Sequence, residues 1–273
     1  MRISIDHRLS FTPPPGTGQA VFHLLLTPRS GPTQTVEGWS VEGPGIGNAG
    51  RFTDGFGNAA HLVNQVRPEG EIVFHVRGEV ETRDSHGVLG RPAGEPVPAL
   101  YRRLTDLTKV PDSFKGDFAN TGGTRLALLH ALMAEVGAVF AMPEAPAAST
   151  QMQADGGQAQ ASAEEPEEQP KPADYAHLFV GAARRLDIPA RYVVGYRLAD
   201  DGEGALHAWA EAFDEGLGWI GFDPQHQLCP TERYVRLAVG LDAATAPTLR
   251  AVPAIKDQDL DHRVSLRVLT SID

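Results

Sequence analysis

The amino-acid sequence predicts an α+β protein in which an N-terminal β-sandwich-like domain precedes a half that packs helices on an antiparallel sheet. Three observations support this fold class. Short segments with alternating apolar residues fill residues 1–84. Two amphipathic helical patterns follow, at residues 124–140 and 173–186. Alternation then returns, and two of the later strands are joined by the turn "EGLG", which is typical of a hairpin.

The composition limits the class of function. The net charge of −11 argues against a nucleic-acid surface, because phosphate binding needs clustered Lys and Arg. No run of 18 apolar residues is present, so we expect no membrane-spanning helix. The first residues lack the apolar region of a secretory signal. A single cysteine, Cys229, excludes an intramolecular disulfide and a cysteine-based zinc cluster. We therefore expect a soluble, cytoplasmic protein.

Residues 1–84 are predicted to form the N-terminal β domain. Apolar residues alternate in "RISIDHRLSF" and "EIVFHVRGEVET", and the apolar run "AVFHLLLTP" stops at Pro28. Glycine-rich clusters between these runs indicate turns, and "DGFGN" at residues 54–58 is most simply a tight turn that uses positive φ. Residues 85–115 contain Gly, Pro and charges without a sustained period, and are predicted to connect the two halves.

Residues 116–273 are predicted to form the second half. Its first helix is capped by Thr124 and carries His130, which we interpret as a structural residue. The second helix ends at "DIP", ahead of strands at 190–199, 205–214 and 218–224. Alternation at 233–239 and 263–269 is expected to complete this sheet.

An acidic insertion interrupts this half at residues 143–171. It consists largely of Ala, Gln, Glu and Pro, and such a segment buries too little apolar surface to offset its ordering entropy. We predict a disordered acidic loop. It is either a solvated insertion or an interaction segment for a basic partner.

One histidine and one aspartate lie on the two strands of the predicted hairpin. Cross-strand neighbours lie within about 5 Å of each other, so His207 and Asp223 could form a hydrogen-bonded pair. A thiol hydrolase or acyl transferase needs such a pair, together with a thiolate at a helix N-terminus.

The segment from His207 to Pro224, "HAWAEAFDEGLGWIGFDP", resembles the histidine–aspartate block of the bacterial transglutaminase-like family. "DYAHLFVGAARRLDIPARYVVGY" is similar to the nucleophile helix and following strand of that family, and "TERYVRLAVGLD" to the segment after its aspartate. "LLLTPRS", "DGFGNAAHLV" and "RGEVET" resemble the N-terminal β domain found with this catalytic domain. The resemblance implies a papain-like, transglutaminase-like core of the cysteine protease superfamily. It also implies His207 as base and Asp223 as the group that orients it.

The nucleophile position departs from the family pattern. The family cysteine stands two residues before the aspartate that corresponds to Asp174, and this chain has Pro172 there. Proline has neither a thiol nor the backbone N–H that commonly helps hold the oxyanion in papain-like chemistry. Loss of one oxyanion donor typically costs about 10²–10³ in rate. Proline suits the first turn of a helix, so we expect Pro172 to start the helix without acting as a nucleophile.

Other nucleophiles have weaker support. Cys229 follows Asp223 by six residues and is interpreted as a small buried hydrophobe. Ser149 and Thr150 lie in the acidic insertion and would reach a cleft only if that segment folded back. Glu211 is interpreted as either a rim charge or a second partner of the site, since it alternates with His207 along one strand.

Other site assignments have plain alternatives. Trp209 and Trp219 are expected in the core of the hairpin, although the family places the tryptophan at position 209 near the cleft. A metal site built from His207, Asp223, His226 and His177 is chemically conceivable. Nothing in the spacing demands one, so we expect no metal and no cofactor.

The residues and the resemblance together predict a pseudoenzyme. We expect a catalytically inactive accessory subunit that binds a protein or peptide, in bacterial peptide or amide-bond metabolism. Relatives of this family are encoded near ATP-grasp and alpha-E type proteins, which suggests one of these as the partner. Two alternatives stay open: an active amide hydrolase or acyl transferase with another nucleophile, and a β domain that is itself the binding surface.

Overall fold

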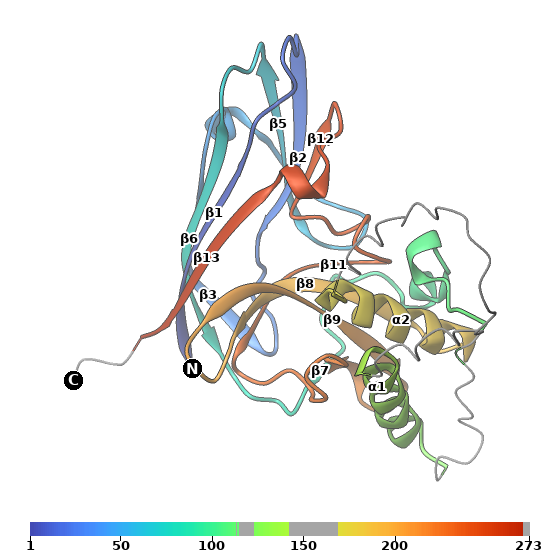
Figure 1. Ribbon diagram of the computed structural model, residues 1–273. Helices are drawn as coiled ribbons and strands as arrows, with labels where there is room; N and C mark the ends of the chain where they lie inside the picture. The colour runs from blue at the N-terminus through green and yellow to red at the C-terminus, as the bar shows by residue number, and fades with distance from the viewer. Residues whose placement is uncertain (113, 115–122, 142–168, 270–273) are drawn as a thin grey trace, which may run out of the picture.

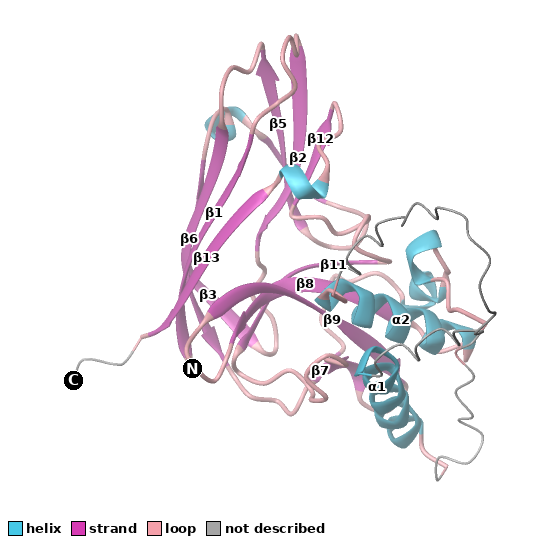
Figure 2. Ribbon diagram, viewed as in Figure 1, coloured by secondary structure: helices cyan, strands magenta, loops and turns pink. Residues whose placement is uncertain are grey.

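The computed structural model describes residues 1–112, 114, 123–141 and 169–269 (Figure 1). These residues form three antiparallel sheets and two α-helices. Figure 2 shows how the strands and helices are arranged. The predicted α+β class is therefore confirmed. None of the helices in this part of the chain is long and apolar enough to cross a membrane.

Two four-stranded sheets form the β-sandwich. The first has the order β13 (Asp261–Val268), β1 (Arg2–Phe11), β6 (Ile72–Thr82) and β3 (Gln34–Glu42). The second has the order β12 (Leu249–Val252), β2 (Gln19–Thr27), β5 (Ala59–Val66) and β4 (Gly50–Thr53). Alternate residues of these strands point inward, and their side chains form one buried cluster that includes Ile3, Phe22 and Phe74. The alternation read from the sequence is thus the inward-facing pattern of a sandwich.

A third, five-stranded sheet carries the helices. Its order is β11 (Tyr234–Gly240), β8 (Ala190–Leu198), β9 (Gly204–Asp214), β10 (Gly218–Phe222) and β7 (Val88–Gly90). Helices α1 (Arg125–Ala141) and α2 (Pro172–Arg185) share a buried apolar cluster with this sheet. The predicted hairpin is confirmed, because β9 and β10 pair across the "EGLG" turn. Gly218 in this turn has φ +81°, and an added Cβ would lie 2.2 Å from the carbonyl oxygen of Gly90, so only glycine fits.

Strands β12 and β13 lie in the sandwich, and this corrects the sequence division. Residues 263–269 were expected to complete the sheet of the second half, but β13 pairs with β1, and Leu266 faces Ile5 across the ladder. Strand β12 pairs with β2 in the same way. Figure 1 shows these red strands beside the blue N-terminal ones. The error has a physical reason: alternation identifies which face of a strand is buried, but it does not identify the neighbouring strand.

The connecting segment is more ordered than its composition indicated. It contributes β7 to the third sheet and forms two short 3₁₀-helices, η2 (Pro98–Arg102) and η3 (Asp106–Thr108). The sandwich core also continues into the third sheet through Tyr196 and Val235. The two halves of the sequence are therefore joined by a shared core as well as by the chain.

Both helix starts follow their local signals. The Thr124 hydroxyl accepts a hydrogen bond from the Ala127 amide, as a cap does. Helix α2 begins at Pro172, in the first turn, where the missing N–H breaks no helical bond. The Asp174 carboxylate accepts the Lys171 amide at 2.7 Å and closes the turn from the other side. The acidic insertion at 143–171 falls almost entirely outside the described residues.

Candidate functional site

His207 and Asp223 form a buried hydrogen-bonded pair. His207 lies on β9, and Asp223 follows directly after β10, so the hairpin brings the two side chains together. The His207 Nε2 atom is 2.7 Å from Asp223 Oδ2. The imidazole is 5% exposed and the carboxylate is fully buried. This is the contact that the cross-strand spacing predicted.

The Asp223 carboxylate accepts five hydrogen bonds. Its Oδ2 atom accepts hydrogen bonds from His207 Nε2 at 2.7 Å, from His226 Nδ1 at 3.0 Å and from the Tyr234 hydroxyl at 2.7 Å. Its Oδ1 atom accepts hydrogen bonds from the backbone amides of Gln225 and His226, at 3.1 and 3.3 Å. Burial alone would raise the pKa of Asp223, but the hydrogen bonds from His207, His226 and Tyr234 outweigh burial and hold this pKa well below its usual range. The carboxylate is therefore ionised at neutral pH.

An ionised carboxylate fixes the protons of its partners. It can only accept hydrogen bonds, so His207 Nε2 and His226 Nδ1 must each carry the proton. The lone pair of a neutral His207 imidazole is then on Nδ1, which has no hydrogen-bond partner among the described residues. Burial and the charge of Asp223 raise the pKa of Tyr234, which stays a neutral donor. The Asp223 carboxylate thus fixes both the orientation and the tautomer of His207.

The sequence did not identify Tyr234 as part of this arrangement. Tyr234 opens β11 and comes to Asp223 through the pairing of β11 with β8. His226 was considered only as a metal ligand, and the structure places it on the same carboxylate oxygen as His207. Its separation of three residues from Asp223 is a local signal that favoured this contact, whereas Tyr234 has no such signal.

Trp209 lies beside the His207–Asp223 pair, and Glu211 is buried further along the same strand. Trp209 stacks near His207 with ring centroids 6.3 Å apart, and it contacts the Tyr234 ring edge-on at 5.4 Å. Glu211 is 1% exposed, so it is not a rim charge. Alternate residues of a strand share a face, which explains why His207, Trp209 and Glu211 lie in one row.

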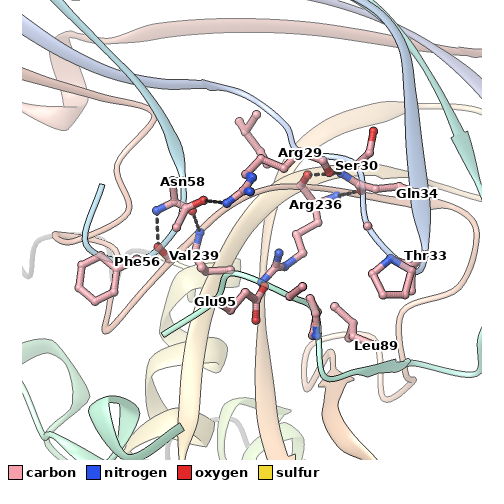
Figure 3. Close-up of a pocket in the computed structure, with 16 residues that line it drawn as sticks. Arg29, Ser30, Thr33, Gln34, Phe56, Asn58, Leu89, Glu95, Arg236 and Val239 are labelled. Atoms are coloured by element: carbon pink, nitrogen blue, oxygen red, sulfur yellow. Dashed lines mark hydrogen bonds and ion pairs between the residues drawn. The ribbon is translucent and has the colours of Figure 1, made fainter. Parts of the chain in front are cut away.

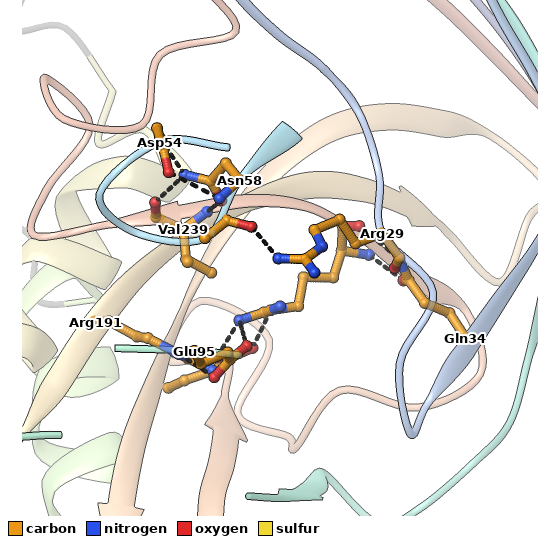
Figure 4. A network of polar contacts seen from close by, with 10 residues as sticks. Arg29, Gln34, Asp54, Asn58, Glu95, Arg191 and Val239 are labelled. Atoms are coloured by element: carbon orange, nitrogen blue, oxygen red, sulfur yellow. Dashed lines mark hydrogen bonds and ion pairs between the residues drawn. The ribbon is translucent and has the colours of Figure 1, made fainter. Parts of the chain in front are cut away.

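Glu211 belongs to a closed network of two arginines and two glutamates. Arg191 contacts Glu211 at 2.6 Å and Glu95 at 2.7 Å, and Arg236 contacts the same carboxylates at 3.0 and 3.1 Å. Figure 4 shows Arg191 and Glu95 of this group from close by. The Arg191 guanidinium also stacks 3.9 Å from the centroid of the Trp219 ring. The network joins β8, β9 and β11 to the connecting segment and balances its own charge.

A small polar cavity of about 60 Å³ adjoins this network, between the sandwich and the third sheet (Figure 3). Two amide side chains from the sandwich hold the backbone of β11 here. Asn58 bonds to both the N–H and the C=O of Val239, at 2.9 and 2.8 Å. Gln34 does the same for Arg236, at 2.8 Å in each direction. The "DGFGN" turn, through Asn58, and the start of β3, through Gln34, therefore serve the contact between the sandwich and the third sheet.

The first turns of helix α2 pack on the third sheet close to His207 of β9. Ala173 and Ala176 of its first turns share an apolar cluster with Leu206 and Ala208, the two neighbours of His207. Pro172 itself is partly buried.

Cys229 does not have the surroundings of a reactive thiol. It packs beside the apolar cluster of α1 and α2, and burial raises its pKa. An activated cysteine needs the opposite shift. Ser149 and Thr150 lie outside the described residues.

His177 lies apart from the pair. Its Nε2 atom accepts the Ala243 amide at 3.0 Å, and its ring stacks on Tyr192. Of the four residues considered for a metal, His207, Asp223 and His226 come together, with ligand atoms all within 4.8 Å of one another.

The comparisons with known proteins agree with this architecture. The Transglutaminase-like superfamily matches residues 146–224, and the Bacterial transglutaminase-like N-terminal region matches residues 3–81. Uncharacterized proteins of Mycobacterium leprae and Mycobacterium bovis are 37% and 31% identical over 86 and 91 residues, each 29% of this chain. The chain matches only 30% and 29% of the length of these curated relatives.

One solved structure is similar over almost the whole chain. It comes from Cytophaga hutchinsonii and is named as a candidate cysteine protease. It is 17% identical, with a TM-score of 0.62 over 99% of this chain and 91% of that one. At this identity the likeness shows the fold, which is papain-like. The two matched regions, residues 3–81 and 146–224, support a bacterial transglutaminase-like family for this chain.

Proposed function

We propose that this protein is a transglutaminase-like pseudoenzyme that binds a protein or peptide and does not catalyse acyl transfer. The observation that carries this proposal is Pro172 in the first turn of α2. In the register set by Asp174, this is the position of the family cysteine. Proline supplies neither the attacking sulfur nor an N–H for the oxyanion.

The surroundings of the pair support the same conclusion. His207 and Asp223 keep the hydrogen bond that a general base needs. The thiol of Cys229 packs among apolar side chains, and its pKa is shifted away from reactivity. The site therefore retains the parts that hold its shape and has lost its attacking group.

The partner is proposed from the family and from the composition of the chain. We propose an ATP-grasp or alpha-E type protein, and a cytoplasmic location. The acidic insertion at 143–171, rich in Glu and without Lys or Arg before Lys171, suits a basic docking surface. The test is binding of a purified candidate partner by calorimetry, with the full chain and with residues 145–170 deleted. Equal affinity for both chains would contradict the docking role of the insertion.

Catalytic silence is tested with glutamine-containing peptides. The wild-type protein is expected to release no ammonia above a His207→Ala control. Ammonia release that disappears in His207→Ala or in Cys229→Ala would instead support the alternative, an amide hydrolase or acyl transferase with another nucleophile. The intact His207–Asp223 pair is the one observation that favours this alternative.

A second experiment tests whether position 172 faces the His207 imidazole, as the family register implies. Pro172→Cys is made in a Cys229→Ala background, so that the introduced thiol is the only one in the chain. We expect iodoacetamide to alkylate it faster than when His207→Ala is also present, because a nearby imidazole favours the thiolate. Equal alkylation rates would show that position 172 does not face the imidazole, and the assigned register would then be wrong.

A further inference from the structure

Three possible metal ligands, His207, Asp223 and His226, come together, although the spacing in the sequence demanded no metal site. Asp223 Oδ2 lies 2.7 Å from His207 Nε2 and 3.0 Å from His226 Nδ1. Two imidazoles and one carboxylate are the ligand types that Zn²⁺ and its neighbours in the first transition row prefer. We propose that His207, Asp223 and His226 form a binding site for a divalent transition-metal ion of the Zn²⁺ type. This proposal goes beyond the pseudoenzyme function and does not rest on it.

The three ligand atoms need only a small movement to hold an ion. Zinc bonds to nitrogen and oxygen are about 2.0–2.1 Å long, so ligand atoms around a tetrahedral ion lie about 3.3 Å apart. The two measured nitrogen–oxygen separations, 2.7 and 3.0 Å, are shorter than that by a few tenths of an ångström. All three ligand atoms lie within 4.8 Å of one another. The two nitrogen–oxygen separations therefore have to grow by a few tenths of an ångström, and the two nitrogens have to approach by at most about 1.5 Å.

The carboxylate keeps its supports when an ion binds. The ion takes the place of the two imidazole protons that now point at Asp223 Oδ2, and in each neutral ring the proton moves to the other nitrogen. The Tyr234 hydroxyl and the amides of Gln225 and His226 continue to bond the carboxylate. Such outer hydrogen bonds fix the orientation of metal ligands and commonly change metal affinity 10–100-fold when removed. The structure therefore already contains a second layer of partners for one of the three ligands.

The site is accessible to solvent at His226. The His226 side chain is 29% exposed, whereas His207 and Asp223 are buried. An ion can enter past His226, and a water molecule can take the fourth position there. Three protein ligands with one open position distinguish such a site from structural zinc sites, which have four protein ligands. Two nitrogen ligands also disfavour Mg²⁺ and Ca²⁺, which prefer oxygen.

A positive charge lies near the site. The Arg197 guanidinium donates to the Tyr234 hydroxyl oxygen at 3.1 Å, and this hydroxyl in turn donates to Asp223. Its positive charge reduces the affinity for a dication, while the Asp223 charge raises it. We therefore expect micromolar affinity in place of the much tighter binding of structural zinc sites.

The test titrates the full-length protein with ZnCl₂ by calorimetry, and with CuCl₂ while tryptophan fluorescence is followed. We expect one Zn²⁺ per chain. Cu²⁺ should quench fluorescence through Trp209, whose ring lies 6.3 Å from the His207 ring, and Trp209→Phe should remove most of that quenching. His226→Gln keeps a donor for Asp223 but removes a ligand, so Zn²⁺ affinity should fall at least tenfold.

Matched variants separate the site from general metal binding. His86→Gln removes an imidazole that is almost fully exposed, and it should leave the affinity unchanged. Cys229→Ala should also leave it unchanged. His207→Gln provides a second ligand variant if His226→Gln folds poorly. The proposal is overturned if the wild-type protein binds no Zn²⁺ at micromolar concentration. It is also overturned if His226→Gln and His207→Gln bind as the wild type does, or if His86→Gln loses as much affinity as they do. None of these results depends on acyl-transfer activity, so the metal site and the pseudoenzyme proposal stand or fall separately.

Discussion

Acid should weaken the junction between the sandwich and the third sheet through His7. This side chain lies on β1 and is fully buried. Its Nδ1 atom is 3.0 Å from the Tyr196 hydroxyl of β8, and its Nε2 atom is 3.0 Å from His262 Nδ1 of β13. Burial lowers the pKa of His7 from 6.5 to about 3, and the neighbouring His262 adds to the effect. The folded protein therefore holds His7 neutral where the unfolded chain would protonate it.

The size of the effect follows from this shift. Above pH 6.5 neither state is protonated, and the stabilisation is complete. As pH falls from 6.5 toward 3, His7 takes up a proton in the unfolded chain but stays neutral in the folded protein, so stability is progressively lost. At pH 5 the two pKa values give a factor of about 30 in the unfolding equilibrium, or about 2 kcal/mol from His7 alone.

Urea unfolding of the wild type and of His7→Gln measures this contribution. Glutamine keeps hydrogen-bonding groups near Tyr196 but does not titrate, so its constant cost cancels when each protein is compared with itself at two pH values. Between about pH 7.5 and pH 5, the free energy of unfolding of the variant should fall by about 2 kcal/mol less than that of the wild type. Other buried histidines contribute equally to both proteins. The reasoning is refuted if both proteins lose the same stability, and His86→Gln, at an exposed position, should behave as the wild type does.

Two further substitutions test the packing around the site. Glu211→Gln leaves the buried Arg191 without a full counter-charge and should cost about 3–5 kcal/mol in urea unfolding, whereas Glu71→Gln, in an exposed ion pair, should cost under about 1 kcal/mol. Equal losses would mean that the buried network contributes no more than a surface pair. Gly218→Ala forces a Cβ against the carbonyl of β7 and should lower the melting temperature clearly more than Gly202→Ala, which has a similar φ but open space around it. Similar melting temperatures for the two would show that backbone conformation alone, and not the contact with β7, requires glycine there.

The sequence predicted those features that depend on local signals. The start of α2 at Pro172 and the hairpin that brings His207 to Asp223 each need only neighbouring residues: a proline in a first turn and a glycine-rich turn between two alternating runs. The family assignment rests on the same hairpin, because its motif combines turn chemistry with the catalytic spacing.

The features that the sequence missed depend on long-range pairing. Tyr234 reaches Asp223 only because β11 pairs with β8, and nothing in "RYVRLAV" specifies that neighbour. Glu211 could be read as a rim charge because its partners, Arg191 and Arg236, lie on other strands. The charge alternation along one strand does not show whether a carboxylate faces water or a buried guanidinium.

The pairing of β12 and β13 with N-terminal strands affects both how this protein folds during synthesis and how it can be cut into fragments. Strands β12 and β13 are synthesised long after their neighbours β2 and β1, so the sandwich cannot close until the intervening segment has been made. A fragment of residues 1–110 would leave the outer hydrogen-bonding edges of β1 and β2 bare, and bare edges recruit other chains. Partner screens with such a fragment would therefore detect non-specific association through these edges and not specific binding. Supplying residues 249–268 in trans, or fusing them ahead of Arg2, would avoid this.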